Sequence, residues 1–482
     1  MTRRRLLGTA ALTAAAAVAA GCDSSSGGGG AGGSGAAGSL SWWDHQNQLE
    51  PAKRAIFESF EATEGGVPVE YTYNNPAKLG QALQLAKQSN QLPDIHSNAG
   101  LEVPVPQLIA GGWVGPLSLD DAAMQRLEGA LVEGKHVFDG AAHSFPIFDH
   151  HVYPTVTWFN TTLTGQAGLD PEAPPRSYEE FRAAARKVQD ASGGKAGGWI
   201  WNIGMPNRLN EQVNVLAQAA GFEGGGGRLY RTGEFAYHDE SYLTVIEFLL
   251  SMQQDGLLVP GSQTLIDDGA RTRWVGGLAG YYFDGPWCPG VALKNTPEFA
   301  ESLGVGPILT PDGGEPTTYR GTQGGEYWLT PTTEMGEQAN RLLSEYFTTE
   351  DYSVEIANTM SQPPRDLEAV ERSNAHPAYK KLITWFADQV FLAPEPIVKN
   401  SETTNVGAES KAVKPSLGDI VQGAFSGDVP DVRAALTELS DKANAEHERA
   451  LAAAKDKGAQ IDAADYVFEN WQPKADFGPD QY

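Results

Sequence analysis

Strand-like and helix-like segments alternate from residue 40 to residue 98, and this pattern restricts the fold more than any other feature of the sequence. "SLSWW" and "VPVEYTY" have the composition of strands, and each is followed by a segment with apolar residues at helical spacing. "LPDIHSN" is a third short strand that ends in polar residues. The alternation predicts an α/β fold in which a sheet is layered by helices.

Three later segments have the pattern of long helices, at residues 174–191, 334–358 and 431–455. The first begins with a capping box formed by Ser177 and Glu180. "GGKAGGWIWNIG" reads as a glycine-rich turn that enters a strand, and it lacks the Ser or Thr after lysine that a nucleotide-binding loop needs.

Length and charge limit the classes of protein to which the chain can belong. With 482 residues, the chain is expected to form two or more domains. Its formal net charge of −26 repels nucleic acid and anionic lipid, so neither is an expected partner. The two cysteines form no CxxC motif and no zinc-spaced Cys/His cluster, so we expect no structural metal and no cofactor.

The first 39 residues have the features of an export signal and a tether. Residues 1–21 combine three arginines, an apolar run and small residues, as secretory signal peptides do, and the arginines resemble a twin-arginine signal. The residues before Cys22 resemble a lipoprotein cleavage box, although Ala19 stands where leucine is usual. The resemblance implies that Cys22 carries a lipid; the alternative is an ordinary export signal with an incidental cysteine.

Residues 22–39 are rich in glycine and serine, a composition that forms flexible tethers. Such a segment reaches about 20–25 Å, from roughly 5–6 Å times the square root of its residue number. We therefore expect an exported protein that is anchored to the cell membrane through its lipid and faces outside.

Several phrases, in a fixed order, resemble one known family. "RAIFESFEATEGGVPVEYTY", "KQSNQLPDIHSN", "LIAGGWVGPLSLDD", the stretch "HSFPIFDHHVYPTVTWFN" and "WVGGLAGYYFDGPWCPG" each match weakly, but their order over about residues 40–450 is specific. Together they resemble the solute-binding lipoproteins of bacterial ABC importers, in the group that binds carbohydrates.

This resemblance implies two α/β lobes that close on a ligand around hinge segments. We expect residues 40–150 and about 286–345 in the first lobe, and about 151–285 and 346–482 in the second. The permease subunits of an importer are the implied protein partners. Two departures from the family pattern are a longer stretch at Pro146–Asn160 and a C-terminal segment after about residue 455 that we could not assign.

Sugars combine apolar C–H faces with hydroxyl groups, so their sites combine aromatic rings with polar side chains. In open α/β sheets such residues lie beyond the carboxyl ends of the strands. Neighbours on a strand face opposite ways, and we assign Trp43 to the ligand and Trp42 to packing. The predicted ligand-binding residues are Trp43, Asp44, His45, Asn98, Asp149, His150, His151, Trp201, Asp284, Trp287, Gly325, Glu326 and Arg365.

The predicted function is capture of a carbohydrate, with a preference for an oligosaccharide because several tryptophans are available for stacking. No catalytic role is expected. Two alternatives remain open from the sequence: the same fold with a non-sugar solute, for which an acidic cleft would favour a cation and an arginine cluster an anion, and an extracellular enzyme that cleaves glycosides with paired carboxylates.

Overall fold

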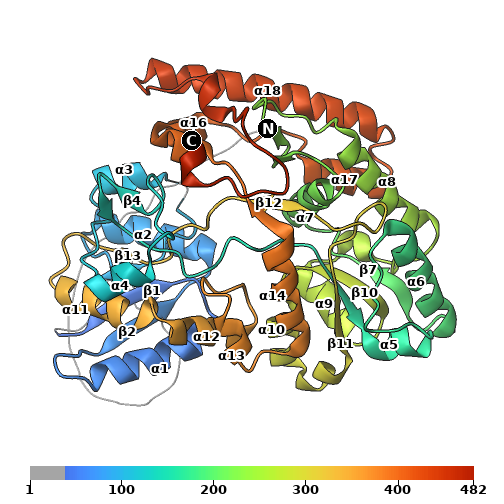
Figure 1. Ribbon diagram of the computed structural model, residues 1–482, viewed down its shortest axis with the longest axis horizontal. Helices are drawn as coiled ribbons and strands as arrows, with labels where there is room; N and C mark the ends of the chain where they lie inside the picture. The colour runs from blue at the N-terminus through green and yellow to red at the C-terminus, as the bar shows by residue number, and fades with distance from the viewer. Residues whose placement is uncertain (1–37, 102) are drawn as a thin grey trace, which may run out of the picture. The chain divides into compact units, whose positions relative to one another are not determined.

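The computed structural model describes residues 38–101 and 103–482 (Figure 1). The predicted signal peptide, Cys22 and most of the predicted tether lie outside the described residues. Within the described residues, no helix is long and apolar enough to span a membrane.

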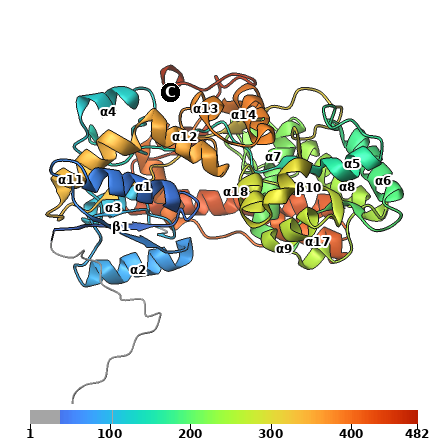
Figure 2. The ribbon, with the colours of Figure 1, turned by 90° about the horizontal axis from the view of Figure 1, so that it is seen from below.

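The first sheet has the parallel βα arrangement that the sequence predicts. Its four strands are, in spatial order, β13 (Trp328–Leu329), β3 (Ile95–His96), β1 (Leu40–Asp44) and β2 (Val69–Tyr73). β1 is parallel to both β2 and β3, whereas β13 is antiparallel to β3. Helices α1 (Glu50–Glu61) and α2 (Pro76–Gln88) lie on opposite sides of β1 (Figure 2), so both faces of this strand are covered.

The second sheet mixes parallel and antiparallel pairs. Its strands are, in spatial order, β11 (Leu303–Gly306), β6 (Val156–Asn160), β10 (Ala279–Asp284) and β7 (Gly197–Ile200). The helices that pack with it include α5 (Thr161–Gln166), α6 (Tyr178–Ala191), α7 (Pro206–Ala219), α8 (Glu240–Gln254), α14 (Pro377–Gln389) and α17 (Leu417–Ser426). The predicted capping box of Ser177 and Glu180 is present at the start of α6.

The remaining elements connect or cover the two sheets. The helices are α3 (Val105–Ala110), α4 (Asp121–Arg126), α9 (Asp267–Val275), α10 (Cys288–Asn295), α13 (Ala369–Arg372), α15 (Pro396–Lys399), α16 (Thr404–Glu409) and the long α18 (Val432–Asp456). Three short pairs of strands are β4 (Val137–Phe138) with β5 (Ala141–Ala142), β8 (Gly224–Gly225) with β9 (Arg228–Leu229), and β12 (Thr318–Arg320) with β14 (Val390–Leu392).

The segment predicted as one helix over residues 334–358 is divided. α11 (Gly336–Leu342) runs into a π-helical turn, η3 (Leu343–Phe347), and a new helix, α12 (Glu350–Thr359), begins after it. The side chain of Thr349 accepts a hydrogen bond from the backbone N–H of Tyr352 and so caps the start of α12. The apolar periodicity continues through the break because all three pieces pack on the first sheet.

The chain crosses between the two sheets three times, and the sheet memberships correct our expected boundaries. β11 belongs to the second sheet and β13 to the first, so the return crossing lies between Gly306 and Trp328, not at residue 286. α12 contributes Tyr352 and Ile356 to the core of the first sheet, so the last crossing follows Thr359, not residue 345. The expected boundaries were wrong because apolar patterning shows that a segment is buried but not in which core.

The three crossings lie side by side. The backbone N–H of Asp149 donates to the carbonyl of Pro363 at 3.1 Å, and that of Arg365 donates to Ile147 at 2.9 Å. The hydroxyl of Ser144 donates to the carbonyl of Tyr327 at 2.7 Å. Hydrogen bonds between crossings give the hinge region a defined structure instead of three independent linkers.

The C-terminal segment, which the sequence left unassigned, folds back on the middle of the chain. Phe468, Trp471 and Phe477 form a buried cluster with Tyr230 and Tyr319. The backbone N–H of Phe468 donates to the carbonyl of Tyr230 at 2.9 Å. The segment is therefore part of the packed body.

Candidate functional site

Asp44 ends β1 and fixes the loop that follows it. Its carboxylate accepts hydrogen bonds from the backbone N–H groups of His45 (2.6 Å) and Gln46 (2.9 Å). It also pairs with the ammonium of Lys53 on α1, and both side chains are fully buried. Burial by itself would raise the pKa of Asp44, but the charge and hydrogen bond of Lys53, together with the hydrogen bond from the Gln46 backbone, hold this pKa below its usual value. In this structure Asp44 thus positions the loop after β1, and the predicted ligand contact of Asp44 stays a prediction.

The loops after β1 and β3 meet, as the carboxyl-end rule predicts. His45 Nδ1 lies 2.7 Å from the hydroxyl of Ser97, and His45 Nε2 lies 3.1 Å from the amide nitrogen of Gln46. His45 remains half-buried. Both polar atoms of the Asn98 amide are buried and form no hydrogen bond of ordinary geometry within residues 38–101 and 103–482, although the amide lies close enough to His96 to raise the pKa of that imidazole against the larger effect of its burial. A buried amide without partners is costly, so Asn98 retains the capacity to bind a polar group.

Two of the predicted stacking tryptophans are core residues instead. Trp43 packs against Leu79 and Leu83 of α2. Trp201 is fully buried, stacks on Trp199 with ring centroids 5.3 Å apart, and donates to the side-chain oxygen of Gln212 at 2.7 Å. The expectation failed because helices cover both faces of these sheets, so strand alternation separates two cores and does not separate core from cleft.

Trp287 is held at the carboxyl end of β10 by a network of buried charges. Its indole N–H donates to Asp284 Oδ1 at 3.0 Å. Asp284 is fully buried and accepts two hydrogen bonds from Arg271, at 2.7 and 3.0 Å. The guanidinium of Arg208 lies over the Trp287 ring, 4.7 Å from its centroid. Trp287 remains half-buried, and Asp284 orients it without facing open space.

Gly285 makes room for this tryptophan. A Cβ atom at position 285 would lie 2.2 Å from Cζ2 of the Trp287 ring, closer than atoms can approach. The "FDGPW" motif therefore contains an acid that orients the ring and a glycine that accommodates it.

These groups line a cavity of about 560 Å³ between the loop after β1 and the carboxyl ends of β7 and β10. Its wall consists of Gln48, Val152, Pro154, Arg208, Glu211, Asp267, Asp268, Arg271, Trp287, Val291, Arg320, Ser361 and Gln362. We refer to it as the first cavity. It meets the general rule that ligands in open α/β folds bind beyond the carboxyl ends of strands.

The charges in this wall balance. Three arginines face three carboxylates, and most of them are paired. Arg208 donates to Glu211 at 2.6 Å and to Asp267 at 3.1 Å. Arg271 donates to Asp268 at 3.2 Å. The Arg320 guanidinium forms no hydrogen bond or ion pair within the described part of the chain, and Glu211 is the charge that acts on its pKa.

A second cavity of about 390 Å³ adjoins the first. The two cavities share four residues in their walls: Val152, Pro154, Glu211 and Arg320. The second cavity extends to Tyr230 and Tyr319, the two tyrosines against which the C-terminal segment packs.

A model of the family described as bacterial extracellular solute-binding proteins matches residues 42–334, which is more than half of the chain. The chain belongs to this family. No curated protein matches it significantly. Among solved structures, the cyclic alpha-maltosyl-1,6-maltose binding protein of Arthrobacter globiformis aligns with a TM-score of 0.60 at 20% identity, over 85% of this chain and 99% of that one.

Two further structures align as well. A solute-binding protein of an ABC transporter from Thermotoga lettingae, bound with alpha-D-tagatose, has a TM-score of 0.61 at 18% identity and covers 85% of this chain and 100% of its own. The maltotriose-binding protein of Thermus thermophilus, bound with maltotriose, has a TM-score of 0.58 at 20% identity, with 85% and 99% covered. At these identities the likeness establishes the two-lobed fold.

In this solute-binding protein, the six remaining predicted residues lie in the hinge region: Asp149, His150, His151, Gly325, Glu326 and Arg365. A Cβ atom on Gly325 would lie 2.3 Å from the Ser144 hydroxyl, so the close approach at this glycine is to another crossing and not to a ligand. Arg365 donates to the backbone carbonyls of Arg126 (2.8 Å) and Thr348 (3.0 Å). Gly325 and Arg365 thus hold the hinge region together, and their predicted ligand contacts stay predictions.

Glu326 is half-buried beside the Asp44–Lys53 pair. Burial and then the charge of Asp44 raise the pKa of Glu326 to about 7. Its carboxyl group therefore changes charge near neutral pH, close to the loop that carries His45 and Gln46.

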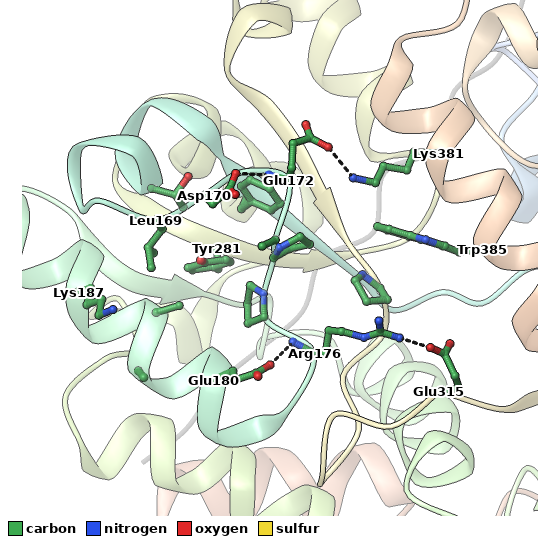
Figure 3. A pocket seen from close by; sticks show the side chains of 18 of the residues that line it. Leu169, Asp170, Glu172, Arg176, Glu180, Lys187, Tyr281, Glu315, Lys381 and Trp385 are labelled. Atoms are coloured by element: carbon green, nitrogen blue, oxygen red, sulfur yellow. Dashed lines mark hydrogen bonds and ion pairs between the residues drawn. The ribbon is translucent and has the colours of Figure 1, made fainter.

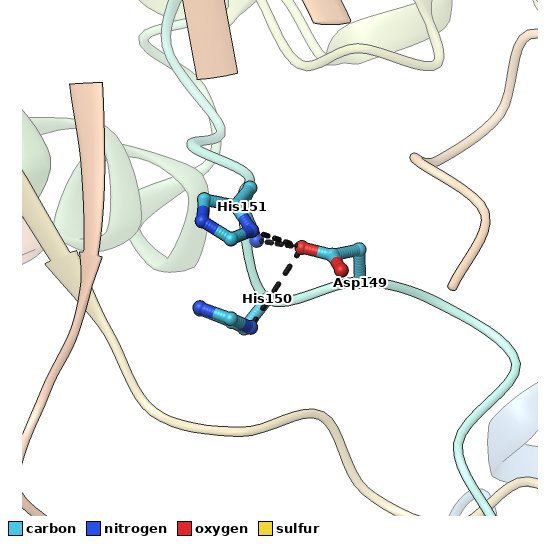
Figure 4. A group of neighbouring side chains, drawn as sticks. All are labelled: Asp149, His150 and His151. Atoms are coloured by element: carbon cyan, nitrogen blue, oxygen red, sulfur yellow. Dashed lines mark hydrogen bonds and ion pairs between the residues drawn. The ribbon is translucent and has the colours of Figure 1, made fainter. Parts of the chain in front are cut away.

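Asp149, His150 and His151 gather in the first crossing, immediately before Val152 of both cavity walls (Figure 4). His151 Nδ1 pairs with Asp149 Oδ1, and His150 Nδ1 lies 3.7 Å from the same oxygen. The three residues do not belong to the wall of either cavity.

A larger cavity of about 720 Å³ lies elsewhere on the second lobe (Figure 3). It is bounded by α5, α6 and α14, with ion pairs between Glu172 and Lys381 (3.1 Å) and between Arg176 and Glu315 (2.5 Å) at its rim. Every residue in its wall belongs to the lobe of the second sheet, so closure of two lobes would not enclose it.

Sequence reasoning missed Arg208, Glu211 and Arg271. The first two follow strand β7 at the start of α7, a position that the carboxyl-end rule could have indicated. Arg320 lies at the end of β12, before an irregular crossing, and no periodic signal marks it.

Proposed function

We propose that this protein captures a carbohydrate in the first cavity and delivers it to an ABC importer. The main support for this proposal is the equal number of positive and negative side chains in the wall of the first cavity. Three arginines and three carboxylates, mostly paired with one another, provide many charged hydrogen-bonding groups without a net charge. A neutral polyhydroxyl ligand suits such a wall, because charged partners strengthen hydrogen bonds to hydroxyl groups. Binding, not catalysis, is the proposed activity.

Trp287 supplies the apolar surface that a sugar also needs. Its half-buried ring is oriented by Asp284 and contacts the guanidinium group of Arg208. An aromatic surface and a group with several hydrogen-bond donors therefore lie side by side. We propose that one sugar ring contacts Trp287 and hydrogen bonds with Arg208 and Glu211. Gln48, and Asn98 after β3, are the proposed contributions of the first lobe.

The adjoining second cavity favours an oligosaccharide. Because the two cavities adjoin at Glu211 and Arg320, we propose that a chain of sugars extends from one to the other along these side chains. Tyr230 and Tyr319 provide aromatic surface in the second cavity.

Capture would follow from closure of the two lobes. A ligand that contacts both lobes stabilises the closed state by the difference between its affinities for the two states. The three hydrogen-bonded crossings are the proposed hinge, with the first lobe built on the first sheet and the second lobe on the second sheet.

We further propose that the protein is exported and tethered through a lipid on Cys22. The apolar run and the small residues before this cysteine support the proposal. In a Cys22→Ser variant, we expect the protein in the culture medium instead of the membrane fraction. Retention of that variant in membranes, with detergent needed for release, would contradict lipid anchoring.

Isothermal titration of the protein against mono- and oligosaccharides tests the proposed function. We expect binding of at least one oligosaccharide, with a smaller affinity for its monosaccharide. Tight binding of an amino acid, peptide or polyamine, with no response to any sugar, would show that the ligand is not a carbohydrate. Shorter chains after incubation with the bound oligosaccharide would indicate a glycoside-cleaving enzyme.

A further inference from the structure

Asp149, His150 and His151 form a compact set of metal-ligating side chains in the first crossing (Figure 4). One ligand atom from each residue lies within 4.8 Å of the other two. The two imidazole rings are 4.0 Å apart between centroids and face each other at a tilt of 38°. Each side chain retains between 16% and 21% of its exposure, so an ion can reach the group from solvent.

The charges around the cluster favour a cation. The Asp476 carboxylate of the C-terminal segment acts on both imidazoles, and Glu395 acts on His150. Glu395 is already committed to Lys135, whose ammonium lies 2.6 Å away. The guanidinium of Arg365 donates to backbone carbonyls and forms no ion pair with Asp149 within the described residues.

We propose that Asp149, His150 and His151 bind a divalent transition-metal ion of the Zn²⁺ type. Two imidazole nitrogens and one carboxylate oxygen are ligands that Zn²⁺ and its neighbours prefer, and three protein ligands leave one position for water or another group. The ion takes the place of the proton that His151 Nδ1 shares with Asp149, and this proton is released to solvent.

The sequence analysis singled out Asp149, His150 and His151 but did not predict a metal site, because these ligands are consecutive in the chain. Zinc motifs are recognised by ligands separated along a helix or a turn, and adjacent ligands have no such spacing. A turn of the chain brings the two imidazole rings together. In this turn the Asp149 carboxylate accepts a hydrogen bond from the backbone N–H of His151 at 2.7 Å, and the three side chains can therefore share one ion.

The site would act on the hinge. Asp149 belongs to the crossing that is hydrogen bonded to Pro363 of the last crossing, and Val152 lines both cavities. An ion held here therefore fixes the segment that connects the hinge with the binding wall. The inference does not depend on the nature of the solute.

Titration of the full chain with ZnCl₂, without a polyhistidine tag and after EDTA treatment, tests the proposal. We expect one ion per chain at micromolar or tighter affinity, and a Zn²⁺-dependent rise in unfolding temperature. In the double variant His150→Gln/His151→Gln and in Asp149→Asn, we expect at least a tenfold loss of affinity. His447→Gln, which changes a histidine outside the cluster, is the matched control and retains the site.

Co²⁺ provides a readout that does not require the variants to fold. A visible absorption band of a bound Co²⁺ ion on the unmodified chain, displaced by one equivalent of Zn²⁺, supports the site. Absence of saturable Zn²⁺ and Co²⁺ binding, or unchanged binding in the folded double variant, would overturn the proposal. Loss of sugar binding with intact metal binding would instead affect only the proposed function.

Discussion

The buried pair of Asp44 and Lys53 illustrates how buried charges can fix the backbone of a loop. Lys53 neutralises the carboxylate, and the carboxylate in turn holds the backbone of His45 and Gln46. Two charges removed from water gain little net stability together, but one left without its partner is costly. The pair therefore specifies the shape of the loop more than it stabilises the fold.

We predict that Lys53→Met lowers the free energy of unfolding by about 3–5 kcal/mol, because it leaves Asp44 charged and unpaired in the core. Urea denaturation measures the change. The neighbouring Arg54 forms a more exposed pair with Glu50, and Arg54→Met is the matched control, with an expected cost below about 1 kcal/mol. Equal effects of the two changes would contradict the orienting role of the buried pair.

Trp287 is the aromatic residue on which the proposed site most depends. We predict that Trp287→Ala weakens binding of the ligand by about 10–100-fold, the range for a well-packed aromatic contact. Trp385→Ala, in the separate cavity of the second lobe, should leave the affinity unchanged. Titration calorimetry of both variants with the same ligand distinguishes them, and a Trp287 variant that binds normally would move the site elsewhere.

Glu326 makes stability depend on pH. Its folded pKa of about 7 lies above the ordinary value of 4.5, so the folded state binds more protons between these values. The stability of the parent protein therefore falls, relative to Glu326→Gln, as pH rises from about 4.5 to 7. We predict that the variant is more stable by about 1–3 kcal/mol at pH 8 and equal at pH 4.

Denaturation of the two proteins across this pH range measures the difference. The exposed Glu337→Gln should show no comparable dependence. A difference between parent and Glu326→Gln that stays constant with pH would show that folding does not shift the pKa of Glu326.

At the scale of elements, glycines mark where helices approach another part of the chain most closely. A Cβ atom on Gly418 of α17 would lie 1.8 Å from the backbone carbonyl oxygen of Pro206, at the start of α7. Gly407 of α16 has no atom within 4 Å of the corresponding position. The two helical glycines therefore offer a matched comparison.

We predict that Gly418→Ala destabilises the protein by more than about 2 kcal/mol, because the backbone of α7 must move, as in overpacked cores. Gly407→Ala should stabilise it by about 0.5–1 kcal/mol through helix propensity. Thermal unfolding of both variants measures whether each substitution raises or lowers the stability. If Gly418→Ala left the stability unchanged, α17 and α7 would be able to separate easily.

The elements themselves could be predicted well from the sequence, because each is encoded locally. The capping box of α6 and the alternation of β1, α1, β2 and α2 depend on neighbours within one turn or one strand. The division at Thr349 and the membership of β11 depend on distant partners, which no local period reports.

The dependence on distant partners also explains which residues of the candidate site could be predicted from the sequence. The resemblance of the "FDGPW" motif pointed to Trp287, which lines the first cavity. The carboxyl-end rule placed His45 and Asn98 at the edge of the first sheet where the loops after β1 and β3 meet. It failed for Trp43 and Trp201 because a strand covered on both faces buries both sets of side chains. Arg320 lies in the crossing between Gly306 and Trp328, and it reaches the wall of the first cavity because of the course of that irregular segment. No local pattern in the sequence indicates this position.

For the whole molecule, the C-terminal segment supports the second cavity from behind. Trp471 is fully buried between Tyr230 and Tyr319, with ring centroids 5.1 and 5.0 Å away. We predict that Trp471→Ala costs about 3–5 kcal/mol of stability. It should also weaken binding of a trisaccharide more than binding of a monosaccharide, because the tyrosines of the second cavity lose their support.

Titration of both sugars below the unfolding temperature measures this selectivity. Asn470→Ala changes the exposed neighbour of Trp471 and is the control. Equal losses for the short and the long sugar would place the whole ligand in the first cavity.

The balanced wall of the first cavity has a consequence for the surroundings in which the protein works. Salt screens interactions of net charge over about 8–10 Å at physiological ionic strength, but it has little to screen between a neutral ligand and a wall whose charges are already paired. The acidic exterior, with a net charge of −26, makes the molecule as a whole respond to salinity. The affinity and the association rate for the ligand should nevertheless remain constant from dilute water to brackish medium.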